Sequence, residues 1–221
     1  EPGQDLPPRF GSARRALVPT LWGHGLTPGT LADLRRQLGD EIVVKPTVGA
    51  NADDAFRLGA EADGAGALET FSNRPFMAQP FVRSVVDWGE TSLFYFDGDY
   101  SHAILKTPAS GDFRVQEEHG GRIRPLNPNP DLREAAQRAV DAAVEITGAE
   151  LLYARPDLVR LEDGSWALME LELIEPSLYF PFDDASPARF ADAFVRWMAR
   201  DGSGFRVRTA PPFGANPNPG P

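Results

Sequence analysis

Two Asp-Gly pairs set the strongest limits on how this chain folds. Asp97-Gly98 and Asp163-Gly164 each lie between two runs of residues that favour β-strands. An Asp-Gly pair in such a place is typical of a tight hairpin turn, because both central positions of that turn need a positive φ. The second half of the chain is therefore predicted to contain two antiparallel hairpins. Their strands are expected over residues 91–96, 100–106, 151–161 and 166–173.

Helices alternate with these hairpins along the chain. Segment 131–147 has an apolar stripe at helical spacing and ends at Gly148, and Ser186-Pro187 begins an amphipathic helix over 188–199. In the first half, Thr27-Pro28 is typical of a helix start, and Gly39 ends that helix. The other elements expected there are a strand over 42–45, a strand over 55–58, a helix over 65–71 and a strand over 76–82.

This order of hairpins and helices predicts an α+β fold with two lobes, each built on an antiparallel sheet. The lobes are expected to meet near residues 82–88, and the cleft between them is the expected ligand site. The full expected organisation is an irregular lead-in over 1–16, a first lobe over 17–82, a second lobe with the metal site over 83–207, and a disordered tail over 208–221.

Charge and composition exclude several classes of function. The net charge of -10 argues against general nucleic-acid binding, because an acidic surface repels phosphate backbones. The chain has no cysteine, which excludes disulfides, thiol chemistry and cysteine-ligated metals. Its apolar runs are too short to span a bilayer, so no membrane role is expected. A cytoplasmic protein fits these features, and a homodimer is the oligomeric form considered for it.

The pattern Glu170-Leu171-Glu172 places two carboxylates on one face of the last predicted strand, because residues two apart in a strand point the same way. The apolar neighbours Met169 and Leu171 are expected on the opposite face. Asp157, on the preceding strand of the hairpin, is expected to complete a three-carboxylate cluster. Oxygen ligands of this kind suit Mg²⁺. The alternative is a solvated outer face of an edge hairpin, which is common on strands.

Basic residues gather at two places in this acidic chain. Lys45 ends an apolar strand before Pro46 and a loop of small residues, an arrangement that lets the ammonium and the loop N–H groups hold phosphate. Further along, Lys106, Arg114, Arg122 and Arg124 surround a glycine-bearing loop over 110–121, where converging cations would neutralise a phosphate in transfer. The alternatives are a surface lysine and a flexible surface loop. The three histidines are too dispersed for a zinc site, and the sequence has no nucleophile–base signature.

In their order and spacing, these motifs resemble the ATP-grasp superfamily of ligases. The resemblance is greatest to glutathione synthetase-like enzymes and to the group of O-ureido-serine cyclo-ligases that form D-cycloserine, and it extends from about residue 16 to residue 200. The motifs that carry it are Val44-Lys45-Pro46, Gln79-Pro80-Phe81-Val82, the segment 106–121, and 169–177.

The resemblance implies a role for each matching residue. Lys45 would contact the phosphates of ATP, and the loop 49–52, which begins at Gly49, would cover them. The remaining residues fall into four groups. The linker from Gln79 through Phe81 to Val82 would bind adenine, and Glu90 would hold the nucleotide or a basic partner. Lys106 and Arg114 would stabilise the phosphoryl group in transfer. The metal ligands for Mg²⁺ or Mn²⁺ would be Asp157, Glu170 and Glu172, and Ser177 would approach the substrate.

The resemblance also implies an activity. The expected reaction joins a carboxylate to a nitrogen, or closes a ring, through an acyl phosphate with release of ADP and phosphate. The substrate would be a small carboxylate such as an amino acid, a ureido acid or a short peptide. The alternatives are a catalytically incomplete ATP-binding module that acts by protein interaction, and an ordinary α+β domain whose motifs arise by chance.

The sequence departs from the family pattern at several points. The N-terminal α/β domain of family members is expected to be absent from this chain, and Glu172 stands where glutathione synthetase-like enzymes use a carboxamide. The covering loop is poor in glycine. Pro156, inside a predicted strand, implies an edge position or a bulge.

Overall fold

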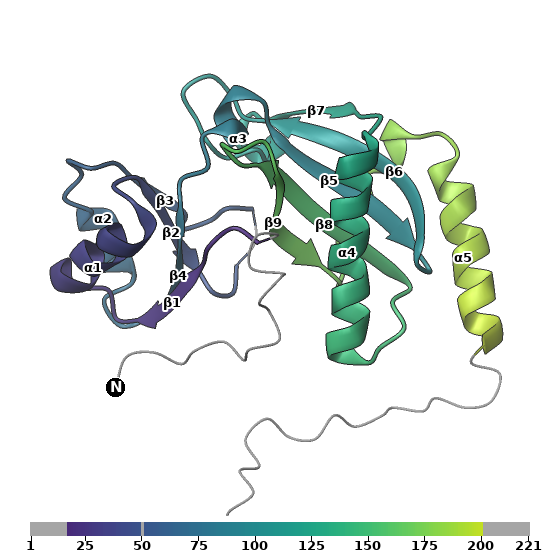
Figure 1. The fold of residues 1–221 in the computed structure, drawn as a ribbon, viewed down its shortest axis with the longest axis horizontal. Coiled ribbons are helices and arrows are strands. Elements are labelled where there is room, and N and C mark those ends of the chain that lie inside the picture. The colour runs from purple at the N-terminus through teal and green to yellow at the C-terminus, as the bar shows by residue number, and fades with distance from the viewer. Residues whose placement is uncertain (1–16, 50, 201–221) are drawn as a thin grey trace, which may run out of the picture.

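The computed structural model describes residues 17–49 and 51–200. The expected lead-in over 1–16 and the expected tail over 208–221 lie outside the described residues, as does the end of the expected second lobe. Within the described part, the chain forms two lobes, each built on an antiparallel sheet with its own helices (Figure 1). The predicted α+β architecture is confirmed.

The first sheet has the strand order β1-β4-β2-β3. Its strands are β1 (Leu21–His24), β2 (Ile42–Pro46), β3 (Phe56–Leu58) and β4 (Pro75–Pro80). Two helices, α1 (Pro28–Leu38) and α2 (Ala65–Thr70), lie on its outer side (Figure 1). The Thr27 side chain accepts a hydrogen bond from the Thr30 N–H at 3.1 Å, so the predicted helix start is confirmed.

Residues of β2 alternate between the two faces of the first sheet. Ile42 and Val44 are fully buried in a core with Leu31, Leu34 and other apolar residues of the two helices. Val43 and Lys45 therefore face the other way, toward the second lobe. This alternation is what brings the side chain of Lys45 into the space between the lobes.

The second sheet has the order β7-β6-β5-β8-β9. Its strands are β5 (Glu90–Phe96), β6 (Asp99–Thr107), β7 (Arg122–Pro125), β8 (Tyr153–Arg160) and β9 (Trp166–Glu172). Helix α4 (Pro130–Thr147) crosses one face, and α5 (Ser186–Arg200) lies at the end far from the first lobe (Figure 1). Shorter helical pieces are α3 (Ser84–Asp87), η3 (Glu117–His119) and η4 (Phe180–Phe182).

Both predicted hairpins form. β5 pairs antiparallel with β6, and the turn residues Asp97 and Gly98 have φ of 54° and 84°. β8 pairs antiparallel with β9 across the second turn. In the first turn both central residues have a positive φ, which matches the right-handed twist of the strands and explains the use of Asp-Gly. In the second turn only Gly164 of the pair has a positive φ, at 82°, so the expected turn with two positive-φ residues forms at Asp97-Gly98 alone.

The structure corrects two details of the sequence interpretation. Pro156 is not at an edge, because β8 lies between β5 and β9; a register shift follows it at 157/158, so the alternative of a bulge is confirmed. The shift also disturbs the expected alternation, because Met169 and Glu170 line one pocket. Arg122 and Arg124, the basic residues expected beside the loop over 110–121, lie on strand β7 directly after it.

The two faces of the second sheet differ in chemistry. The face under α4 is an apolar core that includes Leu93, Tyr95 and Leu158. The opposite face carries the charged residues Glu90, Lys106 and Asp157 at one end, and an aromatic cluster that reaches η4 and α5 at the other. Among the described residues, none of the helices has the length and apolar character that crossing a membrane requires.

Candidate functional site

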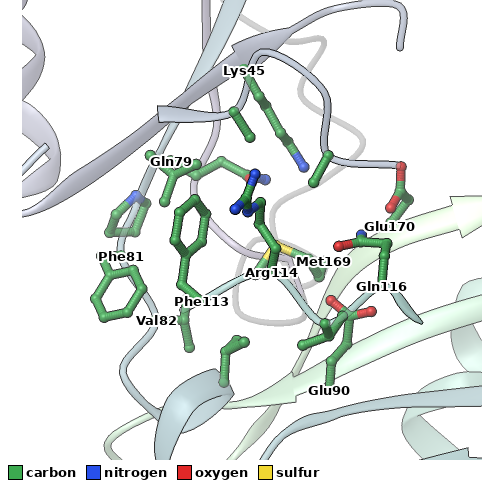
Figure 2. Close-up of a pocket in the computed structure, with 16 residues that line it drawn as sticks. Lys45, Gln79, Phe81, Val82, Glu90, Phe113, Arg114, Gln116, Met169 and Glu170 are labelled. Carbon is green, nitrogen blue, oxygen red and sulfur yellow. The ribbon is translucent and has the colours of Figure 1, made fainter. Parts of the chain in front are cut away.

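A pocket opens between the two sheets, with an empty volume of about 630 Å³ that includes solvent at its mouth. Ligand sites are commonly clefts of this kind, lined mostly by apolar side chains with a few polar groups among them. The first lobe, the linker at 79–82, the loop 113–116 and strand β9 all contribute walls (Figure 2). Seven predicted site residues line it: Lys45, Gln79, Phe81, Val82, Glu90, Arg114 and Glu170.

Lys45 extends into the pocket from strand β2 (Figure 2). Within residues 17–49 and 51–200, its ammonium forms no hydrogen bond or ion pair with the protein. The whole chain has only two lysines, Lys45 and Lys106, against twenty arginines, and both lysines lie in this region. A partnerless cation in a pocket attracts an anionic ligand.

Hydrogen bonds and a cation–π contact hold the linker 79–82, which begins with the last two residues of β4. The Gln79 carboxamide donates to Thr20 Oγ1 at 2.9 Å, and the Phe81 N–H donates to the Glu41 carbonyl at 2.9 Å. The Arg57 guanidinium lies 3.7 Å above the Phe81 ring. Among the described residues, the Val82 N–H has no hydrogen-bond acceptor, although Val82 lines the pocket. The linker therefore offers an unpaired backbone donor beside the pocket, on a support held by these contacts.

The three predicted metal ligands come together beside this pocket. One carboxylate oxygen each from Asp157, Glu170 and Glu172 lies within 4.8 Å of the others. Asp157 is directly opposite Glu170 in the β8–β9 pairing, which explains how the hairpin register assembles the cluster. Burial raises the pKa of Glu172, and the charges of Asp157 and Glu170 add to that effect, although Arg155 opposes it.

Lys106 is deeply buried next to this cluster and does not line the pocket. Its Nζ lies 2.7 Å from Glu90 Oε1 and 2.9 Å from Asp157 Oδ2. Burial alone would lower the pKa of Lys106, but the two carboxylates outweigh burial and raise it. Burial raises the pKa of Glu90, whereas Lys106 and Arg155 hold the pKa of Asp157 below its usual value despite its burial.

Arg155 is a part of this site that the sequence interpretation missed. Its guanidinium contacts Asp157 Oδ2 at 3.0 Å and also pairs with Glu172, and it donates to the Ser177 carbonyl at 3.3 Å. The signal was present in the sequence, because Arg155 lies two residues before Asp157 on the same strand and therefore on the same face. Pro156 lies between them and predicts an irregular strand, in which alternation is a weaker guide.

The charges of this cluster suit a divalent cation. Four carboxylates, Glu90, Asp157, Glu170 and Glu172, face two cations, Lys106 and Arg155, so two negative charges are left when all are ionised. Oxygen donors with a surplus of two negative charges fit Mg²⁺ or Mn²⁺. The donor set therefore agrees with the metal that the sequence motifs imply.

The loop between β6 and β7 forms another wall. Arg114 lines the pocket while its Nη2 contacts Asp112 Oδ2 at 2.7 Å. The hydrogen bond from Arg114 holds the pKa of Asp112 well below its usual range. Gln116, which the sequence interpretation also missed, has a buried Oε1 with no hydrogen-bond partner among the described residues (Figure 2). A single glutamine in a polar loop gave no distinguishing signal in the sequence.

The other predicted residues lie around the pocket. Gly49, the first residue of the covering loop 49–52, does not line the pocket, whereas Ala52 of the loop and Ala55 after it do; residue 50 is outside the described residues. The Asn51 carbonyl accepts a hydrogen bond from His119 Nε2 at 2.8 Å, so this loop contacts the second lobe. Ser177 follows the cluster of three carboxylates in the chain, and Arg155 connects its carbonyl to that cluster.

The fold and the site together define a class of protein. Two antiparallel α+β lobes with a pocket between them, a lysine without a protein partner on one lobe and an acidic cluster on the other, are the features of the ATP-grasp fold. No family model matches the chain. It is nevertheless similar to the crystal structure of D-cycloserine synthetase DcsG, with a TM-score of 0.70 and 33% identity over 85% of this chain and 67% of that one.

Sequence comparison agrees with the structural comparison. The chain is 38% identical to the cycloserine biosynthesis protein DcsG of Streptomyces lavendulae over 194 residues, which are 80% of this chain and 64% of the relative. The ATP-grasp ligase PsnB, in a complex with its minimal precursor, Mg and ADP, has a TM-score of 0.58 at 15% identity over 84% of this chain and 55% of its own, which indicates a shared fold. The chain belongs to the ATP-grasp ligases, and it spans just under two thirds of the length of the Streptomyces protein.

Proposed function

We propose that this chain binds ATP and magnesium in the pocket between its sheets and uses them to join a carboxylate to a nitrogen. One observation carries the proposal: a lysine without a protein partner and a cluster of three carboxylates lie on the two lobes that enclose one pocket. A triphosphate needs cations around it, and magnesium is held in proteins by one or two carboxylates together with substrate phosphates. The two halves of the site fit these two needs.

The pocket suggests an orientation for the nucleotide. The apolar end, with Phe81, Val82 and Phe113, suits an adenine ring, and the free Val82 N–H offers it a hydrogen bond. The triphosphate would then extend toward Lys45 and the carboxylate cluster. Glu90 lines the pocket, but its carboxylate is occupied by Lys106, which supports its expected role of holding a basic partner.

The proposed reaction has two steps. A carboxylate oxygen of the substrate forms a bond to the γ-phosphorus of ATP as the bond from that phosphorus to the bridging oxygen breaks, which gives an acyl phosphate and ADP. A nitrogen nucleophile then forms a bond to the carbonyl carbon, phosphate leaves, and the nitrogen loses a proton to a base. When bound at Asp157, Glu170 and Glu172, magnesium would neutralise charge on the phosphates.

Residues of this chain would act on charge and on water. Arg114 lines the pocket and can approach the phosphoryl group in transfer, and Lys106 and Arg155 hold the carboxylates in place from behind. Preorganised charges of this kind stabilise a transition state. The contact between His119 and Asn51 joins the covering loop to the second lobe, which helps to keep water from the acyl phosphate.

The similarity to D-cycloserine synthetase favours a small acid that carries its own nitrogen nucleophile, such as a ureido amino acid. The decisive test is a screen for ADP release with amino acids, ureido acids including O-ureido-serine, and short peptides. We expect ADP and phosphate with at least one acid. AMP and pyrophosphate would reject the acyl-phosphate mechanism. ATP binding without turnover of any acid would favour the alternative, a nucleotide-binding module without catalysis.

A further inference from the structure

The loop over residues 173–179, between β9 and η4, has an imposed shape. Two of its residues, Glu175 and Tyr179, are not glycines and yet have φ of 48°. Such a conformation is unfavourable for a residue with a side chain and persists only when the surroundings determine it. The structure must therefore hold this loop by specific contacts.

Three side chains from one face of the second sheet supply these contacts. Tyr153 Oη accepts from the Glu175 N–H at 3.1 Å, and Arg155 donates to the Ser177 carbonyl at 3.3 Å. His102 Nε2 lies 3.0 Å from the Leu178 carbonyl. A carbonyl oxygen only accepts hydrogen bonds, so His102 Nε2 carries a proton and donates it.

The tautomer of His102 is set by a chain of hydrogen bonds that reaches α5. Arg189 Nε donates to Ser101 Oγ at 2.9 Å, and Ser101 Oγ lies 2.9 Å from His102 Nδ1. Because the arginine donates to that hydroxyl, the hydroxyl proton is free to point at Nδ1, which accepts it in the neutral ring. Asp183 Oδ1 in turn holds Arg189 Nη2 at 2.5 Å.

The His102 ring itself cannot move easily. It stacks on Phe94 with 4.2 Å between ring centroids and an angle of 9°, and only 4% of the residue is exposed. Burial lowers its pKa, which agrees with a neutral ring. Because stacking and two hydrogen bonds fix its position, the ring is a rigid support for the Leu178 carbonyl.

The peptide that joins Ser177 to Leu178 connects His102 to the proposed active site. Ser177 and Leu178 are consecutive, and the carbonyl of Ser177 is bound by the same Arg155 that pairs with Asp157 and Glu172. We propose that His102 is a positioning residue that fixes loop 173–179 against the carboxylate cluster and thereby sets where the acid substrate binds. This inference rests on the proposed ligase function. An ordinary core histidine would contribute to stability alone.

A matched pair of variants tests the proposal. His102→Phe keeps a ring that can stack on Phe94 but removes both hydrogen bonds, whereas the terminal amide of His102→Gln can still donate to the Leu178 carbonyl. With the acid found in the ADP-release screen, His102→Phe should raise KM for the acid by about tenfold, the size expected for one lost hydrogen bond. KM for ATP should stay within about twofold of the wild-type value in both variants. His102→Gln should recover most of the loss.

Hydrogen–deuterium exchange supplies a readout that needs no substrate. Backbone amides of 173–179 should exchange faster in His102→Phe than in the wild type or His102→Gln, while amides of β2 and β4 should not change. If His102→Phe fails to fold, Ser101→Ala removes the hydroxyl that orients the ring and should shift the same amides by a smaller amount. Unchanged exchange in the loop, or equal losses in the Phe and Gln variants, would overturn the proposal. Absence of ADP release with every acid would instead count against the ligase function alone.

Discussion

Lys106 and Asp157 form a buried ion pair across strand β5, with 2.9 Å between Nζ and Oδ2. Glu90, on β5 itself, binds the same ammonium at 2.7 Å. Only 5% of Lys106 and 1% of Asp157 are exposed. Buried charges are costly unless they are paired, so this group is stable only as a set. The resemblance implies a role for Lys106 in phosphoryl transfer. In the structure, its ammonium also pairs with one carboxylate on β5 and one on β8.

Replacing Lys106 by Met should therefore lower the free energy of unfolding by about 3–5 kcal/mol at pH 7, because carboxylates are left buried without their cation. Urea unfolding measures this change. The matched control is Arg138→Met, which breaks an exposed pair with Glu134 in α4 and should cost less than about 1 kcal/mol. Equal effects of the two substitutions would show that the buried group does not depend on its lysine.

The pH dependence should differ between these proteins. In the wild type, the pKa of Asp157 is lowered, so its stabilisation is present above its ordinary value of 3.8 and is lost as pH falls through its folded value. In Lys106→Met, Glu90 loses the cation that opposes its burial, so its already raised pKa rises further. The folded variant then takes up a proton before the unfolded chain does. Its stability should rise as pH is lowered from 7 toward 4.5, the ordinary value for Glu.

Lysine-directed labelling should separate the two lysines of this chain. A lysine-reactive ATP analogue should modify Lys45, which is free in the pocket, and should leave Lys106 unmodified while the protein is folded. Peptide mass spectrometry identifies the site. Excess ATP should protect Lys45. Lys45→Ala should weaken ATP binding in calorimetry with little change in stability, because Lys45 forms no hydrogen bond or ion pair with the described residues. Comparable labelling of both lysines, or unchanged ATP affinity in Lys45→Ala, would contradict the proposed nucleotide position.

The two lysines also illustrate what the sequence can predict. The position of Lys45 follows from local rules, because alternation along a β-branched strand decides which side chains face the cleft. The two hairpins also follow from a local rule, because an Asp-Gly pair between two strand-forming runs favours a tight turn. The environment of Lys106 depends also on the pairing of β5 with β8, which brings Asp157, 51 residues further along the chain, to its ammonium. No local pattern specifies that register.

The carboxylate cluster lies between these cases. Asp157, Glu170 and Glu172 share one hairpin, so turn and alternation predicted that their oxygens would be close. Arg155 and the contact of Ser177 with it were not anticipated, because the chain beyond β9 folds back through residues with positive φ that are not glycine. Such backbone conformations are imposed by tertiary contacts and leave no signature in the sequence.

Removing one carboxylate should expose the role of this cluster in metal binding. With a non-hydrolysable ATP analogue present, magnesium should raise the melting temperature of the wild type, because a ligand that binds only the folded state stabilises it. Glu170→Gln should lose most of this increase. Without metal it should be at least as stable as the wild type, because Glu170 raises the pKa values of Glu90 and Glu172 by repulsion. Glu162→Gln, exposed beside the β8–β9 turn, is the control and should behave like the wild type.

Arg114 lines the pocket, and the question is whether its charge acts on the phosphoryl group or only anchors the loop. Its guanidinium is held by Asp112, which also accepts the N–H groups of Phe113 and Arg114. Loop shape therefore depends mainly on Asp112 and its backbone contacts. Arg114→Ala should leave those contacts intact and lower kcat by about 10²–10³, the usual effect of losing one group that stabilises transition-state charge.

Two variants separate these alternatives for Arg114. Asp112→Asn can still accept the backbone N–H groups but releases the guanidinium from its ion pair, so kcat should fall far less than in Arg114→Ala. Arg122→Ala removes a neighbouring charge from the edge strand β7, away from the lining of the pocket, and should leave kcat unchanged. Steady-state rates of ADP release measure all three. If Arg114→Ala turns over as fast as the wild type, the arginine anchors a surface loop and has no part in phosphoryl transfer. A loss in Arg122→Ala as large as that in Arg114→Ala would show that the total positive charge matters more than the position of one guanidinium.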